Sequence, residues 1–129
     1  MKRDMDVIRK IILTVKEKEF NSEPDAWEKD NCIRSAEGVP EDVFKYHTML
    51  LKEAGLVKAI VGGGDPIPSE AVILDLTWEG HDFADSISND TVWDTAKGRV
   101  QKVGSWTFDL LVECLKQEAK KRIGLVISG

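Results

Sequence analysis

The residues best suited to chemistry are two histidines and the acidic side chains near one of them. His81 precedes Asp82 and has three further acidic residues close by in the chain: Glu79, Asp85 and Asp90. Histidine and carboxylate ligands of this kind can hold a metal ion for hydrolysis. Such a centre needs more histidines than the chain supplies, so we interpret the stretch as a solvated helix face. A metal-dependent hydrolase stays a third hypothesis.

Two other features suggest catalysis without completing a motif. His47 could act as a general base, yet no serine or cysteine lies at a recognisable spacing, and we predict a hydrogen-bonded core histidine. The glycines at 62–64 suggest a phosphate-binding loop, but Asp65 and Pro66 follow where Lys and Ser or Thr are required. The two cysteines form no zinc motif. We therefore expect no enzyme activity, no catalytic residue, no metal and no cofactor.

A helix predicted for 40–54 carries the candidate DNA contacts. Proline suits the first position, two acids follow it, and Gly55 suits a left-handed cap. Helical spacing predicts an inward face of Val43, His47, Leu50 and Ala54, widened by Phe44 and Leu51. The opposite stripe could contact phosphates or base edges through Lys45, Thr48 and Lys52.

The charge distribution opposes nucleic-acid binding. The net charge is −5, and residues 61–96 hold eight acidic residues and no lysine or arginine. That is the wrong sign for a surface that holds phosphates by electrostatics. The alternative is a protein-interaction surface that uses acidic and aromatic side chains, with these candidates: Asp65, Glu70, Asp75, Trp93 and Trp106.

The remaining elements follow from apolar periodicity and from turn residues. We predict helices at 4–18, 78–87 and from 91 towards 101, and a last helix from Ser105 to Gly124. Strands are predicted at 56–61 and 71–77, joined by a loop rich in glycine and proline. Residues 25–38 admit two readings, a short helix through Trp27 or a short strand at 32–35.

This order predicts an α+β fold with a winged-helix-like domain at 1–88. Its wing is a two- to three-stranded antiparallel sheet. A C-terminal helical extension at 89–129 is expected to pack on it within a single structural domain. One element is weak: a helix-turn-helix needs a short helix before the recognition helix, and residues 32–39 are a poor candidate for it.

Several short motifs occur in a fixed order along residues 1–97. They are the opening Met-Lys-Arg-Asp-Met-Asp at 1–6, Tyr-His-x-x-Leu-Leu-x-Glu-Ala-Gly-Leu at 46–56, and Leu-Thr-Trp-Glu-Gly-His-Asp-Phe at 76–83. Together they resemble domain of unknown function family 2513, found in bacteria and their prophages. The resemblance implies a winged-helix-like domain without an established activity, and no site residues can be carried over from it.

We accordingly expect a small cytoplasmic regulatory protein of bacterial or prophage origin. We expect neither a signal peptide nor a membrane span, because residues 1–6 have no apolar core of signal-peptide type and no apolar run approaches spanning length. The first hypothesis is a DNA-binding transcriptional regulator acting as a homodimer. The second is a non-DNA-binding protein-interaction module, an adaptor or a phage-encoded inhibitor, that uses its acidic wing.

Overall fold

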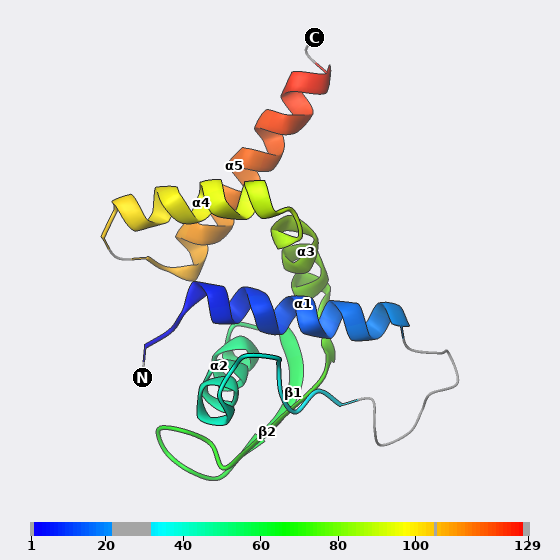
Figure 1. Cartoon of the computed structure of the whole chain (residues 1–129), viewed down its shortest axis with the longest axis vertical. Coiled ribbons are helices and arrows are strands. Elements are labelled where there is room, and N and C mark those ends of the chain that lie inside the picture. The colour runs from blue at the N-terminus through cyan, green and yellow to red at the C-terminus, as the bar shows by residue number, and fades with distance from the viewer. Residues whose placement is uncertain (1, 22–31, 105, 128–129) are drawn as a thin grey trace. The chain divides into compact units, whose positions relative to one another are not determined.

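A computed structural model describes residues 2–21, 32–104 and 106–127. That part of the chain is α+β, as predicted, with five helices and one two-stranded antiparallel sheet (Figure 1). The elements are α1 (Met5–Asn21), α2 (Glu41–Glu53), β1 (Val57–Gly62), β2 (Glu70–Leu76), α3 (Trp78–Ile87), α4 (Asp90–Lys102) and α5 (Phe108–Ile127). The chain divides into two compact units, Met1–Ala84 and Asp85–Gly129, at a boundary within α3. The sequence predicted the boundary after residue 88.

Helix α1 begins where an aspartate can cap it. The Asp4 carboxylate accepts hydrogen bonds from the backbone N–H groups of Asp6 and Val7, at 2.9 and 3.3 Å. It thereby satisfies two donors that have no partner inside the helix. The apolar side chains predicted for this helix are buried: Met5, Ile8, Ile11, Ile12 and Val15.

Helix α2 ends in a Schellman motif at Gly55, which has φ +76°. The N–H of Gly55 donates to the carbonyl of Lys52, and the N–H of Leu56 donates to the carbonyl of Leu51, both at 3.0 Å. Glycine adopts this left-handed conformation without a Cβ clash. The predicted glycine cap is confirmed, and Leu56 directly after it is buried.

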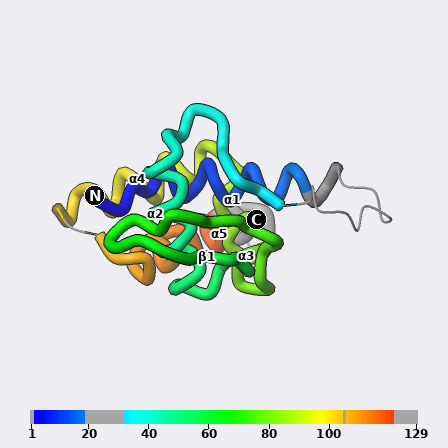
Figure 2. The backbone as a smooth tube through the Cα atoms, turned by 90° about the horizontal axis from the view of Figure 1, so that it is seen from below, coloured from blue at the N-terminus to red at the C-terminus, as the bar shows by residue number. Residues whose placement is uncertain are grey.

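The two strands form a hairpin with one irregularity. Cα pairing runs from Val57↔Leu76 to Gly62↔Glu70, and the register shifts between Lys58 and Ala59 (Figure 2 shows the strands side by side). A single bridge joins Ile33 to Ile73 on the other side of β2. This bridge supports the strand interpretation of residues 32–35, whereas the alternative helix through Trp27 lies outside the described residues.

The loop between the strands is closed by its own hydrogen bonds. Ser69 donates from its backbone N–H to the carbonyl of Gly63 at 3.1 Å, and from its hydroxyl to the carbonyl of Gly62 at 3.0 Å. Gly63 and Gly64 both have φ +68°. A Cβ at Gly64 would collide with the carbonyl oxygen of Ile67. The glycines therefore permit a specific loop shape.

In the first unit, α1 and α2 pack against each other and against β2. Ile73 of β2 is fully buried, as are Ile11 of α1 and Phe44 of α2. The elements follow in the order helix, isolated bridge, helix and hairpin, which is compatible with the predicted winged-helix-like domain. Residues 34–40 contain a turn but no helix, so the described segment directly before α2 does not supply the first helix of a helix-turn-helix.

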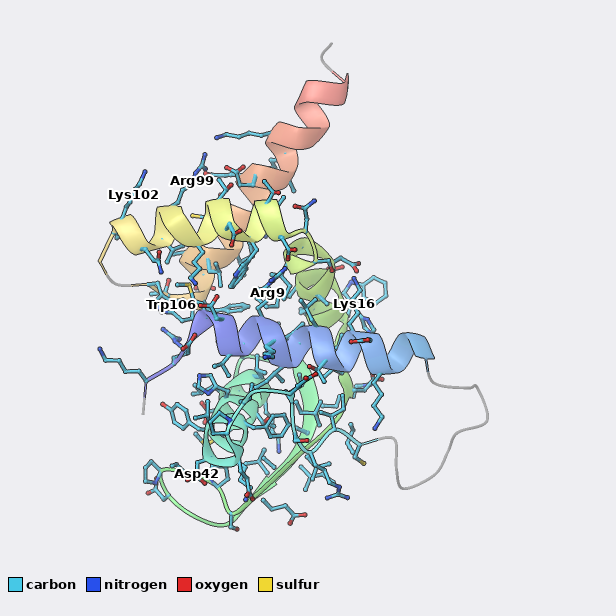
Figure 3. The ribbon with its side chains drawn as sticks, in the orientation of Figure 1. Arg9, Lys16, Asp42, Arg99, Lys102 and Trp106 are labelled. Carbon is cyan, nitrogen blue, oxygen red and sulfur yellow. The ribbon has the colours of Figure 1, made fainter. Side chains whose placement is uncertain are left out.

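The second unit is built on the pair α4 and α5. Apolar residues of both helices are buried, among them Trp93, Val100, Leu111 and Leu115. Arg99 of α4, labelled in Figure 3, forms an ion pair with the buried Glu118 of α5, with an N–O distance of 2.8 Å. No helix in the described ranges is both long and apolar enough to cross a bilayer.

Two predictions about α5 are wrong. The helix begins at Phe108, and its cap is Thr107, whose hydroxyl accepts a hydrogen bond from the N–H of Leu110 at 3.1 Å. The predicted cap, Ser105, lies outside the described residues. The helix also continues through Gly124 to Ile127, because glycine lowers helix propensity without being incompatible with a helix.

Two glycines within helices, one crowded and one with open space around it, give a matched test of how closely α3 packs in the first unit. A Cβ at Gly80 of α3 would collide with the backbone carbonyl of Leu56, whereas a Cβ at Gly98 of α4 would meet nothing within 4 Å. Gly80→Ala should lower the free energy of unfolding by roughly 1–3 kcal/mol through overpacking. Gly98→Ala should raise it by about 0.5–1 kcal/mol through helix propensity. Urea denaturation followed by circular dichroism measures both, and equal effects would contradict the close approach at Gly80.

Candidate functional site

The predicted DNA-contact stripe of α2 does not exist as a continuous surface. Thr48 is 0% exposed and lies in the core, so the prediction that it contacts DNA is wrong. The buried positions of α2 are Phe44, His47, Thr48 and Leu51. They follow the i, i+3, i+4, i+7 spacing of one helix face. This face is rotated relative to the predicted one, whose Ala54 is exposed.

Lys45 is held by a neighbour on its own helix. Its Nζ lies 2.7 Å from a carboxylate oxygen of Glu41, one turn earlier. The hydrogen bond from Lys45, and then its positive charge, lower the pKa of Glu41. Lys52 is exposed near the C-terminal end of α2. At the other end, Figure 3 shows Asp42 in the first turn. The outer side of α2 is thus mixed in charge and not basic.

His47 uses both ring nitrogens inside the first unit. Its Nε2 accepts a hydrogen bond from the backbone N–H of Asp4 at 2.9 Å, and its Nδ1 lies 2.7 Å from the carbonyl of Val43. This arrangement assigns the proton to Nδ1. With an exposed fraction of 1%, His47 is the predicted core histidine, and it ties α2 to the residue that caps α1.

The predicted protein-interaction residues fall in different environments. Asp65 and Glu70 are exposed on the loop and at the start of β2, and Asp75 is half-buried opposite Lys58. Trp93 is 2% exposed in the second unit. Its predicted role in binding a partner is therefore wrong, because a buried indole in the α4–α5 core offers no surface. Trp106 is half-buried just before α5.

Among the residues whose burial the structure describes, the most exposed large apolar one was not among the predicted site residues. Trp78, the first residue of α3, is 80% exposed, and Ile60 and Leu74 of the hairpin are also exposed. An exposed tryptophan is a frequent anchor of protein interfaces. The sequence feature that could have identified Trp78 as exposed is its place directly after Thr77. The hydroxyl of Thr77 caps α3 by accepting a hydrogen bond from the N–H of Gly80 at 3.0 Å. A residue in the first turn has no preceding turn to cover it.

Acidic residues accompany this tryptophan in the first unit. Residues 57–84 contain one lysine and five acidic residues, which gives a formal net charge of −4. We call the following set the acidic surface: Asp65, Glu70, Asp75, Trp78, Glu79 and Asp82. All of its members are exposed except Asp75, which is half-buried.

The rest of the first unit offers little for catalysis. A shallow groove of about 410 Å³ is lined by residues of both charges, namely Asp6, Arg9, Lys10, Leu13, Thr14, Glu17 and Glu37. None of these is a nucleophile of a recognisable catalytic set. Over the described residues, no three His, Cys, Asp or Glu side chains gather in a way that could hold a metal ion.

Comparison with known proteins assigns a family. The model of the family described as "Hypothetical protein (DUF2513)" matches residues 2–106. The chain belongs to this family. An uncharacterised protein of Haemophilus influenzae is 34% identical over 134 residues, covering 99% of this chain and 100% of the relative. No solved structure matches the chain.

The DUF2513 match ends between two helices of the second unit. It extends from α1 through α4 and ends at Trp106, before α5 begins. Helix α5 nevertheless completes the core of the second unit, because Leu111 and Leu115 are buried with residues of α4. The family description and the relative's name state no activity, so the site must be argued from geometry.

The burial of Thr48 can be tested directly. Its hydroxyl is buried without a hydrogen-bond partner, and an unsatisfied buried hydroxyl destabilises the folded state. Thr48→Val keeps the shape and removes the hydroxyl, so it should raise the free energy of unfolding by on the order of 1 kcal/mol. Thr48→Ser, which keeps the hydroxyl and loses a methyl group, should lower it. Destabilisation by valine in urea denaturation would contradict the assigned environment.

The Glu41–Lys45 pair predicts a measurable titration. The folded-state pKa of Glu41 is depressed, so the pair stabilises the fold above the unfolded-state pKa. This contribution is lost as the pH falls through the folded-state pKa. The effect on stability should be small because Glu41 is fully exposed. In Lys45→Met, the pKa of Glu41 measured by NMR should return towards its ordinary value; an unchanged pKa would refute the pairing.

Proposed function

We propose that this protein is a small bacterial or prophage-encoded adaptor that binds a basic partner protein through the acidic surface and has no catalytic activity of its own. The observation that carries the proposal is the exposure of Trp78, at 80%, within the stretch 57–84, whose formal net charge is −4. An exposed indole offers a large, rigid contact area, and surrounding carboxylates steer a cationic partner towards it.

The charges on the hairpin and on helix α2 argue against the DNA-binding alternative. A winged helix that reads DNA places cations of its helix and wing near phosphates. In this protein Thr48 is buried and Lys45 is paired with Glu41. The hairpin loop carries Asp65 and no lysine or arginine. A duplex close to this surface would meet carboxylates.

One observation keeps DNA binding as a second candidate function. The order of α1, the Ile33 bridge, α2 and the hairpin follows that of winged-helix regulators. Lys52 is exposed on α2. This candidate rests on fold analogy, which says nothing by itself about function.

A titration with duplex DNA separates the two candidates. Phosphate contacts strengthen as the salt concentration falls, so a DNA-binding protein should bind at low salt and release DNA as salt is raised. We expect no binding in fluorescence anisotropy even at low salt. Binding that weakens with salt and is reduced by Lys52→Met would overturn the adaptor proposal in favour of a DNA-binding regulator.

A comparison of charge variants tests the adaptor proposal itself. One variant neutralises part of the acidic surface, with Asp65→Asn, Glu70→Gln and Asp75→Asn. A control variant removes the same charge elsewhere in the first unit, with Glu37→Gln, Asp42→Asn and Glu53→Gln. Anisotropy of a labelled lysine-rich peptide should report binding to the wild type and to the control, and about tenfold weaker binding to the first variant. Equal losses of peptide affinity in both variants would show that the net charge of the protein, and not the position of the acidic surface, causes the effect.

A further inference from the structure

The hairpin has one face turned away from the core. Side chains alternate between the two faces of a strand, and directly paired residues share a face. Ile73 is fully buried, which places it and its half-buried partner Ala59 on the core side. Ile60 and its partner Val72 therefore lie on the opposite face. We call this opposite side of the hairpin the outer face.

A second exposed apolar side chain, that of Leu74, lies at the register shift. Lys58 pairs with Asp75 and Ala59 pairs with Ile73, so Leu74 is an extra residue without a Cα partner. Such a bulge re-aims the side chains of the strand that carries it. Ile60 is 56% exposed and Leu74 is 46% exposed, whereas Val72 on the same face is buried. The open part of the outer face thus centres on Ile60 and Leu74.

Charged residues border this apolar centre. On the alternation argument Glu70 lies towards the loop end, and Asp75 lies opposite Lys58 towards the other end. Apart from Lys58, the charges that residues 57–84 contribute are all negative. An apolar centre with a charged rim is the usual anatomy of a protein-binding patch.

The charge decides which occupant this face suits. A second copy would bring another formal charge of −4 from residues 57–84 against the first, and like charges held together repel. A nucleic acid is excluded by the same sign. A segment that carries apolar side chains between lysines or arginines satisfies both the centre and the rim.

We propose that the outer face of the hairpin docks a basic segment of the partner protein, with Ile60 and Leu74 receiving its apolar side chains. This inference rests on the proposed function, because it names an apolar contact on the hairpin that adds to the charge attraction of the acidic surface. The carboxylates orient the segment, and burial of the apolar side chains supplies binding energy that salt does not screen.

The test uses two labelled peptides of equal charge. One is lysine-rich with leucines at alternate positions, and the other has serines in place of the leucines. The protein variants are Ile60→Thr and Leu74→Thr, singly and together. Threonine keeps strand propensity, and both positions are exposed, so circular dichroism and thermal unfolding should confirm that the variants fold like the wild type.

The wild type should bind the leucine peptide at least about fivefold more tightly than the serine peptide in anisotropy titrations. The double threonine variant should lose that difference while keeping its affinity for the serine peptide. Equal affinity of the wild type for both peptides, or an advantage for leucine that survives in the double variant, would overturn the docking proposal. If neutralisation of Asp65, Glu70 and Asp75 leaves the affinity for both peptides unchanged, the proposed function itself is wrong.

Discussion

The backbone at Gly55 and Leu56 is the constraint on which the first unit depends. The left-handed turn at Gly55 ends α2 and starts β1 at once. The carbonyl of Leu56 then accepts from the N–H of Thr77 at 3.0 Å, and that of Gly55 accepts from the Thr77 hydroxyl at 2.6 Å. Gly80 lets α3 approach the same carbonyl of Leu56. Two residues thereby join a helix end, both ends of the hairpin and a helix start, and they hold Trp78 at the surface.

Features that depend on a few neighbouring residues could be predicted from the sequence. The Asp4 cap, the Schellman end at Gly55 and the start of α3 after Thr77 all follow from short-range hydrogen bonding. The orientation of α2 could not be predicted in this way. Thr48 faces inward because the packing of α1 and β2 against Phe44 and Leu51 sets the rotation of the helix, and that packing is made by residues distant in sequence.

Trp78 and Trp93 show the same limit. Trp78 and Trp93 both lie in the first turns of helices that begin after a polar cap, Thr77 and Asn89. Composition predicts aromatic contacts for both without saying with what. Trp93 is buried in the second unit, where α4 and α5 pack on each other, whereas Trp78 stands at the first position of α3 and is exposed. A cap followed by the first turn of a helix therefore does not by itself determine whether a tryptophan is buried.

The acidic residues around the hairpin act on the protein even before a partner binds. An exposed apolar patch on a sheet invites association between copies, and charged side chains near it oppose that association. With Ile60 and Leu74 exposed and residues 57–84 at −4, the hairpin repels its own copies and attracts cations by the same field. In the proposed adaptor, resistance to self-association and preference for a basic partner then have one physical origin. A docking surface without this charge would gain apolar contacts at the cost of self-association.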